Sequence, residues 1–203
     1  SPTWQPSRRS LYAEKNRFKL RLRTYGDAFA RGSFAEIKQR VDRIILKKRV
    51  ALGPSTVDLV QQPIADWAQL LQDPDDQRAA DAYASFARLA HRLAAAPMLG
   101  VRYVRDAFES AVDEPVRVTI DSALEYVPVG GLAAGSAWRR AHTVPDVLEV
   151  KFTDAFPYWI RQLIERFELT RVSLAKYVSC VQAFAEEGGL VDAAAEELVT
   201  WTQ

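Results

Sequence analysis

The sequence predicts an α+β fold in which antiparallel β-strands carry a helical insertion and are followed by C-terminal helices. Residues 17–23 alternate charged and apolar side chains, which is the period of a strand with one buried face. Residues 55–96 space their apolar side chains at helical intervals instead, and residues 158–184 do so again. These observations predict the order strands, helices, strands, helices.

Three strands are expected before residue 53. They cover residues 13–24, 33–41 and 44–52. Residues 26–32 form the first turn, and Asp42 and Arg43 reverse the chain before the third strand. Because short turns join antiparallel neighbours, the three strands should form a meander, and most of the charged side chains on it are basic.

The helical insertion runs from residue 55 to about residue 96, and residues 73–76, Asp-Pro-Asp-Asp, divide it into two helices. Two further helices are expected at residues 158–167 and 173–184. We expect the aromatic residues on the apolar faces of these helices to pack against the outside of the strands: Trp67, Tyr83, Phe86, Trp159 and Phe167.

Strand alternation resumes at Pro97 and places Val101, Tyr103 and Arg105 on one face. Further strands are expected at residues 116–121 and 147–152. A short acidic helix is expected at residues 192–200.

Length and composition bound the possibilities. A chain of 203 residues with 48% hydrophobic residues can bury a core, and one domain is expected over residues 1–203. No apolar run approaches the roughly 20 residues of a membrane-spanning helix, so a cytoplasmic protein is expected. The single cysteine, Cys180, and two histidines exclude a cysteine-based or histidine-rich metal site. Any metal should be a hard cation held by carboxylate and phosphate oxygens.

The net charge of +1 conceals a steep asymmetry along the chain. Residues 1–50 carry a net charge of +10 and the remaining residues −9. Positive charge gathered on a few strands indicates an anion site, whereas the near-zero total argues against a protein that coats nucleic acid.

The charged faces of the predicted strands collect about ten cations and only two or three carboxylates. If these strands close into a barrel with those faces inward, the interior is too charged to be dry, and a threaded chain of phosphates would balance it. Arginine side chains bind two phosphate oxygens at once, and lysines supply point charges between them. The residues are Arg17, Lys19, Arg21, Arg23, Glu36, Lys38, Arg40, Lys47, Arg49, Arg105, Arg117, Glu149 and Lys151.

Glu149 has two interpretations. A carboxylate among cations can hold Mg²⁺ or Mn²⁺ against phosphate oxygens, or it can form an ion pair with Lys151 or an arginine. Spacing alone leaves both open.

Seven stretches in order resemble the polyphosphate polymerase (VTC, vacuolar transporter chaperone) domain of the triphosphate tunnel metalloenzyme, or CYTH-like, superfamily. Each stretch is weakly specific alone, but their shared order covers most of the chain. They are RFKLRLRTYG at 17–26, FAEIK at 34–38, KKR at 47–49, YVR at 103–105, VRVTID at 116–121, VLEVK at 147–151 and VSLAKY at 172–177.

This resemblance implies an antiparallel tunnel barrel that transfers the γ-phosphoryl group of ATP to a growing polyphosphate chain with Mn²⁺ or Mg²⁺. Glu149 would be the metal ligand. The expected catalytic residues are Arg21, Arg23, Lys38, Arg105 and Arg117. The expected phosphate-binding residues are Lys19, Lys47, Arg49, Lys151 and Lys176, of which periodicity alone gave Lys176 no role.

The chain departs from the family pattern in two places. The family begins with a strand bearing a lysine and glutamates, then a helix and a second strand, and we expect this chain to start after them, which would leave the barrel incomplete. Some members also carry a lysine three residues before the position of Lys176, where this chain has Ser173.

A metal-dependent polyphosphate polymerase that binds ATP and polyphosphate is therefore the leading hypothesis. Two alternatives share the same tunnel: a hydrolase of triphosphates or phosphoanhydrides, and a non-catalytic module that binds polyphosphate or nucleotides. A nucleic-acid partner is not expected, because aromatic residues do not interleave with the basic ones as stacking platforms require. Partner domains in a longer protein are compatible with all three.

Overall fold

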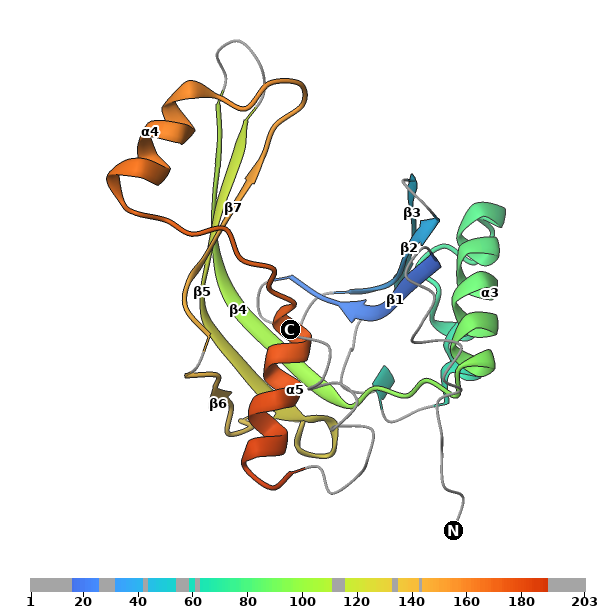
Figure 1. Cartoon of the computed structure of the whole chain (residues 1–203). Coiled ribbons are helices and arrows are strands. Elements are labelled where there is room, and N and C mark those ends of the chain that lie inside the picture. The colour runs from blue at the N-terminus through green and yellow to red at the C-terminus, as the bar shows by residue number, and fades with distance from the viewer. Residues whose placement is uncertain are drawn as a thin grey trace. The chain divides into compact units, whose positions relative to one another are not determined.

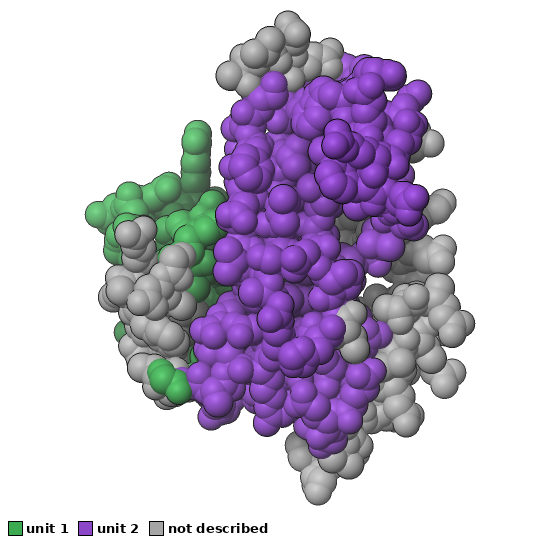
Figure 2. Space-filling view, turned by 90° about the vertical axis from the view of Figure 1, so that its left-hand side faces the viewer, with its two compact units in different colours: residues 1–98, 132–135 green, residues 99–131, 136–203 purple. Residues whose placement is uncertain are grey.

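The computed structural model describes residues 16–25, 32–41, 44–53, 59–60, 63–110, 116–132, 135–142 and 144–189. The chain divides into two compact units, coloured separately in Figure 2. The first unit comprises residues 1–98 and 132–135, and the second comprises residues 99–131 and 136–203. Each unit is described by itself below.

The first unit contains the predicted basic meander. Strands β1 (Asn16–Arg23), β2 (Ser33–Val41) and β3 (Ile44–Leu52) form an antiparallel sheet in that order (Figure 1). The second and third strands have the predicted bounds. The turn at residues 26–31, the reversal at residues 42 and 43, and the side chains of Arg17 and Arg40 lie outside the described residues.

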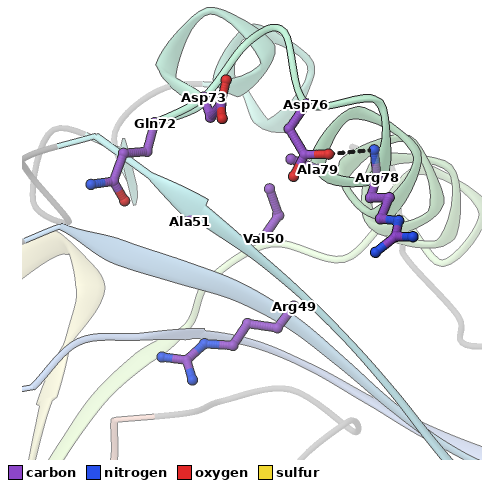
Figure 3. A pocket seen from close by; sticks show the side chains of 8 residues that line it. All are labelled: Arg49, Val50, Ala51, Gln72, Asp73, Asp76, Arg78 and Ala79. Atoms are coloured by element: carbon purple, nitrogen blue, oxygen red, sulfur yellow. Dashed lines mark hydrogen bonds between the residues drawn. The ribbon is translucent and has the colours of Figure 1, made fainter.

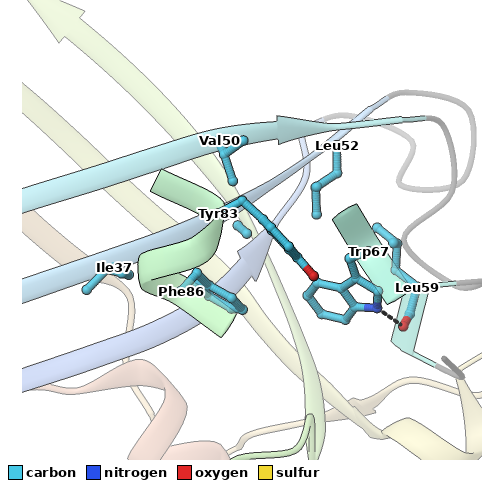
Figure 4. Close-up of a cluster of buried hydrophobic side chains, with 8 residues drawn as sticks. Ile37, Val50, Leu52, Leu59, Trp67, Tyr83 and Phe86 are labelled. Carbon is cyan, nitrogen blue, oxygen red and sulfur yellow. Dashed lines mark hydrogen bonds between the residues drawn. The ribbon is translucent and has the colours of Figure 1, made fainter. Parts of the chain in front are cut away.

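One face of this first sheet is apolar and covered by helices. A 3₁₀-helix, η1 (Ile64–Leu70), and an α-helix, α3 (Gln77–Arg92), pack against it. Asp76 caps α3 by accepting a 2.8 Å hydrogen bond from the backbone N–H of Arg78, which explains why the acidic segment divides the insertion. Of the expected first helix, residues 59 and 60 are α-helical and residues 64–70 form the 3₁₀-helix η1. Figure 4 shows the core between helices and sheet, which includes Ile37, Val50, Leu52, Leu59, Trp67, Tyr83 and Phe86.

The second unit is built on one long central strand. β5 (Arg117–Pro128) pairs with β4 (Leu99–Glu109) along one edge. On its other edge β5 pairs first with β7 (Val147–Lys151) and then with β6 (Arg139–Arg140). All of these pairings are antiparallel, and η2 (Val129–Gly131) follows β5.

β5 continues past the strand predicted at residues 116–121 and contains a β-bulge. Ala123 has φ +52°, and the register with β4 shifts at this point. The extra residue reverses the alternation, so Asp121 before the bulge and Leu124 and Tyr126 after it all lie on the side covered by helix α5 (Lys176–Glu186). A prediction based on strict alternation between the two faces therefore ends this strand at residue 121, just before the bulge.

Helix α4 (Tyr158–Arg166) corrects part of the core prediction. Its inner stripe is Ile160, which is fully buried, with Leu163 and Ile164 partly buried. Trp159 lies beside that stripe and Phe167 just past the helix, so these two are 47% and 63% exposed rather than packed as predicted. The three aromatic residues of the first unit are buried as expected.

Cys180 lies in the core of the second unit, where burial raises the pKa of its thiol to about 11. No helix in the described part of the chain is both long and apolar enough to cross a membrane. The expected acidic helix at residues 192–200 lies outside the described residues. The fold is therefore α+β with antiparallel sheets, as predicted.

Trp67 provides a direct test of the first core. It is 1% exposed, stacks on Phe86 with ring centroids 6.0 Å apart, and donates a 2.9 Å hydrogen bond to the carbonyl of Leu59. We expect Trp67→Ala to lower the free energy of unfolding by about 3–5 kcal/mol in denaturant titrations. The control Trp159→Ala should change it by less than about 0.5 kcal/mol. Equal losses in the two variants would contradict this assignment of the core.

Candidate phosphate-binding faces

The side of the first sheet opposite its core is a cationic face. Figure 3 shows Arg49 projecting from β3 away from the side on which Val50 and Asp76 lie. The strand register places the cations of this face in two rows across the three strands. The lysine row is Lys19, Lys38 and Lys47, and the arginine row is Arg21, Glu36 and Arg49.

Glu36 is the buried centre of the arginine row. Its side chain is 2% exposed, and Arg21 donates a 2.5 Å hydrogen bond to its Oε2. Its Oε1 is buried without a hydrogen-bond partner and lies 3.6 Å from both Lys47 Nζ and Arg49 Nε. Burial raises the pKa of Glu36. The hydrogen bond and charge of Arg21 and the charges of Lys47 and Arg23 together lower it by more, so the net shift is downward. Glu36 is therefore ionised and holds cations from β1 and β3 around itself.

The second sheet has a matching centre at Asp121, whose side chain is 1% exposed. Arg105 binds it through two hydrogen bonds, Nε to Oδ1 at 2.5 Å and Nη2 to Oδ2 at 2.6 Å. Lys176, the first residue of α5, places its Nζ 2.8 Å from Oδ2. Burial raises the pKa of Asp121, but the hydrogen bonds from Arg105 and Lys176 outweigh it and lower the pKa overall.

Glu149 lies beside this cluster and makes looser contacts. Its Oε2 is 3.5 Å from Arg105 Nη2 and its Oε1 is 3.2 Å from Lys151 Nζ, and 39% of its side chain is exposed. The ion-pair interpretation of Glu149 is therefore present in the structure. Within the described ranges, no group of three or more His, Cys, Asp or Glu side chains could hold a metal ion.

The comparison with protein families places these two faces in a known domain. The sequence model of the VTC domain matches residues 2–185. The chain belongs to the VTC domain family. Comparison with curated proteins gives no match. The family is associated with polyphosphate polymerase, a transferase, so the function of the chain is related to polyphosphate.

The structure distributes the predicted site residues over the two faces. In the first unit Arg21, Lys47 and Arg49 gather around Glu36, Lys19 and Lys38 complete the lysine row, and Arg23 follows Arg21 on β1. In the second unit Arg105 and Lys176 bind Asp121, and Glu149 lies between Arg105 and Lys151. Arg117 lies opposite Lys151 in the register and forms an exposed 3.2 Å ion pair with Glu109.

Glu36 and Asp121 are the two buried, ion-paired carboxylates to which sequence reasoning gave no role of their own. Glu36 stood in the predicted charged face, and Asp121 alternated with the apolar residues of its strand. Each is a single carboxylate that lies opposite an arginine on a neighbouring strand. This pairing can be identified only when the register between the strands is known.

The cluster around Asp121 predicts a pH dependence of stability. Because the folded pKa of Asp121 is lowered, its stabilisation is complete above the unfolded pKa of about 3.9 and is lost as the pH falls through the folded value. Asp121→Asn should reduce the free energy of unfolding by about 1.5–3 kcal/mol at pH 7. The deficit relative to the wild type should shrink below pH ~4 in denaturant titrations. A deficit that does not vary with pH would contradict this role.

Proposed function

We propose that the protein is a metal-dependent polyphosphate polymerase that transfers the γ-phosphoryl group of ATP to a growing polyphosphate chain. The observation that carries the proposal is that a VTC domain presents, on each of two sheets, arginine and lysine side chains gathered around one buried carboxylate. Such partly exposed cations can exchange a carboxylate oxygen for a phosphate oxygen at little geometric cost.

The reaction needs no side-chain nucleophile. A terminal oxygen of the polyphosphate chain attacks the γ-phosphorus of ATP, the bond between that phosphorus and the β,γ-bridging oxygen breaks, and ADP leaves. The protein aligns the two anions and neutralises the charge that spreads over the transferred group. In this proposal the residues that act on the transferred group are Arg21, Arg23, Lys38, Arg105 and Arg117. Those that hold the rest of the phosphates are Lys19, Lys47, Arg49, Lys151 and Lys176.

The carboxylate of Glu149 fits a hard divalent cation. It supplies oxygen donors, is partly exposed, and makes looser contacts than Asp121, whose two oxygens both accept charged hydrogen bonds. Bound Mn²⁺ or Mg²⁺ would neutralise phosphate oxygens, which would also have to complete its coordination. Glu149 would then exchange its contacts with Arg105 and Lys151 for the cation.

The proposal also includes the antiparallel tunnel barrel that the family resemblance implies, in which the phosphate chain is threaded. We also propose a cytoplasmic location, where ATP is available as the donor. The function is tested by incubating the protein with ATP and Mn²⁺ and analysing the products. Long-chain polyphosphate and ADP support the polymerase, whereas orthophosphate without polymer would indicate transfer to water.

Two adjacent lysines of β3 test the cationic face of the first sheet. Lys47 contacts Glu36 on that face, while Lys48 points to the other side and donates a 2.9 Å hydrogen bond to Ser85 of α3. Lys47→Ala should lower the rate of polymer synthesis by about 10²-fold, because it removes a charge that holds the neighbouring phosphates in position for the transfer. Lys48→Ala, which removes the same charge from the other face, should leave the rate within about twofold of the wild type. Similar rates in the two variants would contradict the assignment of the face.

Glu149→Gln tests the metal assignment separately. The variant should require at least about tenfold more Mn²⁺ for half-maximal activity, because the amide loses the negative charge that attracts the cation. Binding of tripolyphosphate without metal, measured by calorimetry, should be unchanged or tighter, because a negative charge has been removed beside Arg105 and Lys151. An unchanged Mn²⁺ requirement would remove Glu149 as a ligand and leave the ion-pair interpretation.

A further inference from the structure

An aromatic pair lies at one end of the cationic face of the first sheet. Tyr25 follows β1, and Phe34 is the second residue of β2. Their rings meet edge to face with centroids 6.1 Å apart and planes at 71°. Tyr25 is 47% exposed, which leaves ring surface open to a ligand. We call these two residues the aromatic end of the face.

Arginines join the aromatic end to the arginine row. The guanidinium carbon of Arg49 lies 3.5 Å from the centre of the Phe34 ring and 5.7 Å from that of Tyr25, and Arg49 Nε is 3.6 Å from Glu36. Arg23 lies over the Tyr25 ring at 4.5 Å. The same guanidinium groups therefore touch both an aromatic surface and the cluster expected to bind phosphate.

The face consequently has a chemical order along its strands. The aromatic end comes first, the arginine row follows, and the lysine row comes last. Residues on one face of a strand are spaced by about 6.8 Å, so each step is comparable to the span of one part of a nucleotide. An inorganic phosphate chain has no planar, uncharged group that could contact the aromatic end.

A hollow of about 250 Å³ opens at the aromatic end and is lined by Tyr25, Gly32, Phe34 and Gln72. This volume is close to the lower end of the range of about 300–1,000 Å³ typical of small-molecule sites. Gln72, which Figure 3 labels together with Ala51, donates a 3.2 Å hydrogen bond from its backbone N–H to the carbonyl of Ala51 in β3. Its carboxamide offers both a donor and an acceptor, the pair of groups that the edge of a nucleobase pairs with.

A second hollow, also of about 250 Å³, does not suit an anionic ligand. Its lining combines Arg49 and Arg78 with Asp73 and Asp76 (Figure 3). Asp76 is already engaged as the cap of α3. Because the second hollow is lined largely by charged side chains and the aromatic end presents two rings, the aromatic end is the better site for an uncharged, planar group.

We propose that the aromatic end binds the base of the nucleoside triphosphate donor, with the base against Tyr25 and Phe34 and the phosphates directed along the arginine and lysine rows. This inference rests on the proposed function, because it takes ATP as the donor. It assigns the donor a subsite that the polyphosphate product does not occupy. Tyr25 is then a residue that distinguishes a nucleotide from an inorganic phosphate chain.

The test compares ATP with inorganic tripolyphosphate, which carries the same number of phosphates without a base. Binding of each to the full chain is measured by calorimetry for the wild type, Tyr25→Ala, Tyr25→Phe and a control, Tyr158→Ala, which removes an exposed tyrosine of α4. Tyr25→Ala should weaken ATP binding by about fivefold or more and tripolyphosphate binding by less than about twofold. Tyr25→Phe keeps the ring and should retain the affinity for ATP, and Tyr158→Ala should change neither. Thermal unfolding of each variant monitors folding.

Two outcomes would overturn the inference. Equal weakening of ATP and tripolyphosphate in Tyr25→Ala would mean that the ring only positions Arg23 and Arg49. Unchanged binding of both would mean that the base lies elsewhere. Either can occur while the wild type still makes polymer, and selective loss of ATP binding can occur in a protein that makes none. Failure of the inference and failure of the proposed function are therefore distinguishable.

Discussion

Repulsion between like charges on neighbouring strands is the constraint on which both cationic faces depend. The register of the first sheet places Lys19, Lys38 and Lys47 directly opposite one another, an arrangement that destabilises a sheet on its own. The ionised Glu36 lies one row away and attracts cations from both flanking strands. In the second sheet Asp121 has the same effect on Arg105 and Lys176. One buried carboxylate per sheet offsets the repulsion that a phosphate-binding face creates.

The same two carboxylates also restrain the positions of the cations before a ligand binds. Arg21 and Arg105 are bound to them, yet their side chains remain 50% and 30% exposed, so part of each faces solvent while its position is restrained. Restraint before binding reduces the entropy lost when a phosphate is gripped. In the proposed polymerase, the negative charge would also compete with the ligand and so moderate the affinity for a chain that has to advance after each transfer.

Alternation of charged and apolar residues was enough to predict the strands of the first sheet and the side on which its described cations lie, because a strand has a strict period of two. It failed at Ala123, where the bulge changes the parity of β5 and hides the continuation to Pro128. It also misplaced Trp159 and Phe167, since a helical apolar stripe does not say which aromatic residue at its margin is covered. The pairing of Glu36 with Arg21 required the register, which no single strand contains.

Lys176 shows why a site residue on a helix needs the whole unit to position it. Periodicity gave it no role, yet its Nζ reaches Asp121 because α5 is docked along its length. Cys180 and Val181 pack on Leu124 and Tyr126 in the middle of the helix. Just past its end, Glu187 accepts 2.6 Å hydrogen bonds from the Tyr126 hydroxyl and from Arg139. The bulge at Ala123 turns Asp121 toward the same side as this apolar surface, so a backbone irregularity in β5 brings the lysine and the carboxylate together.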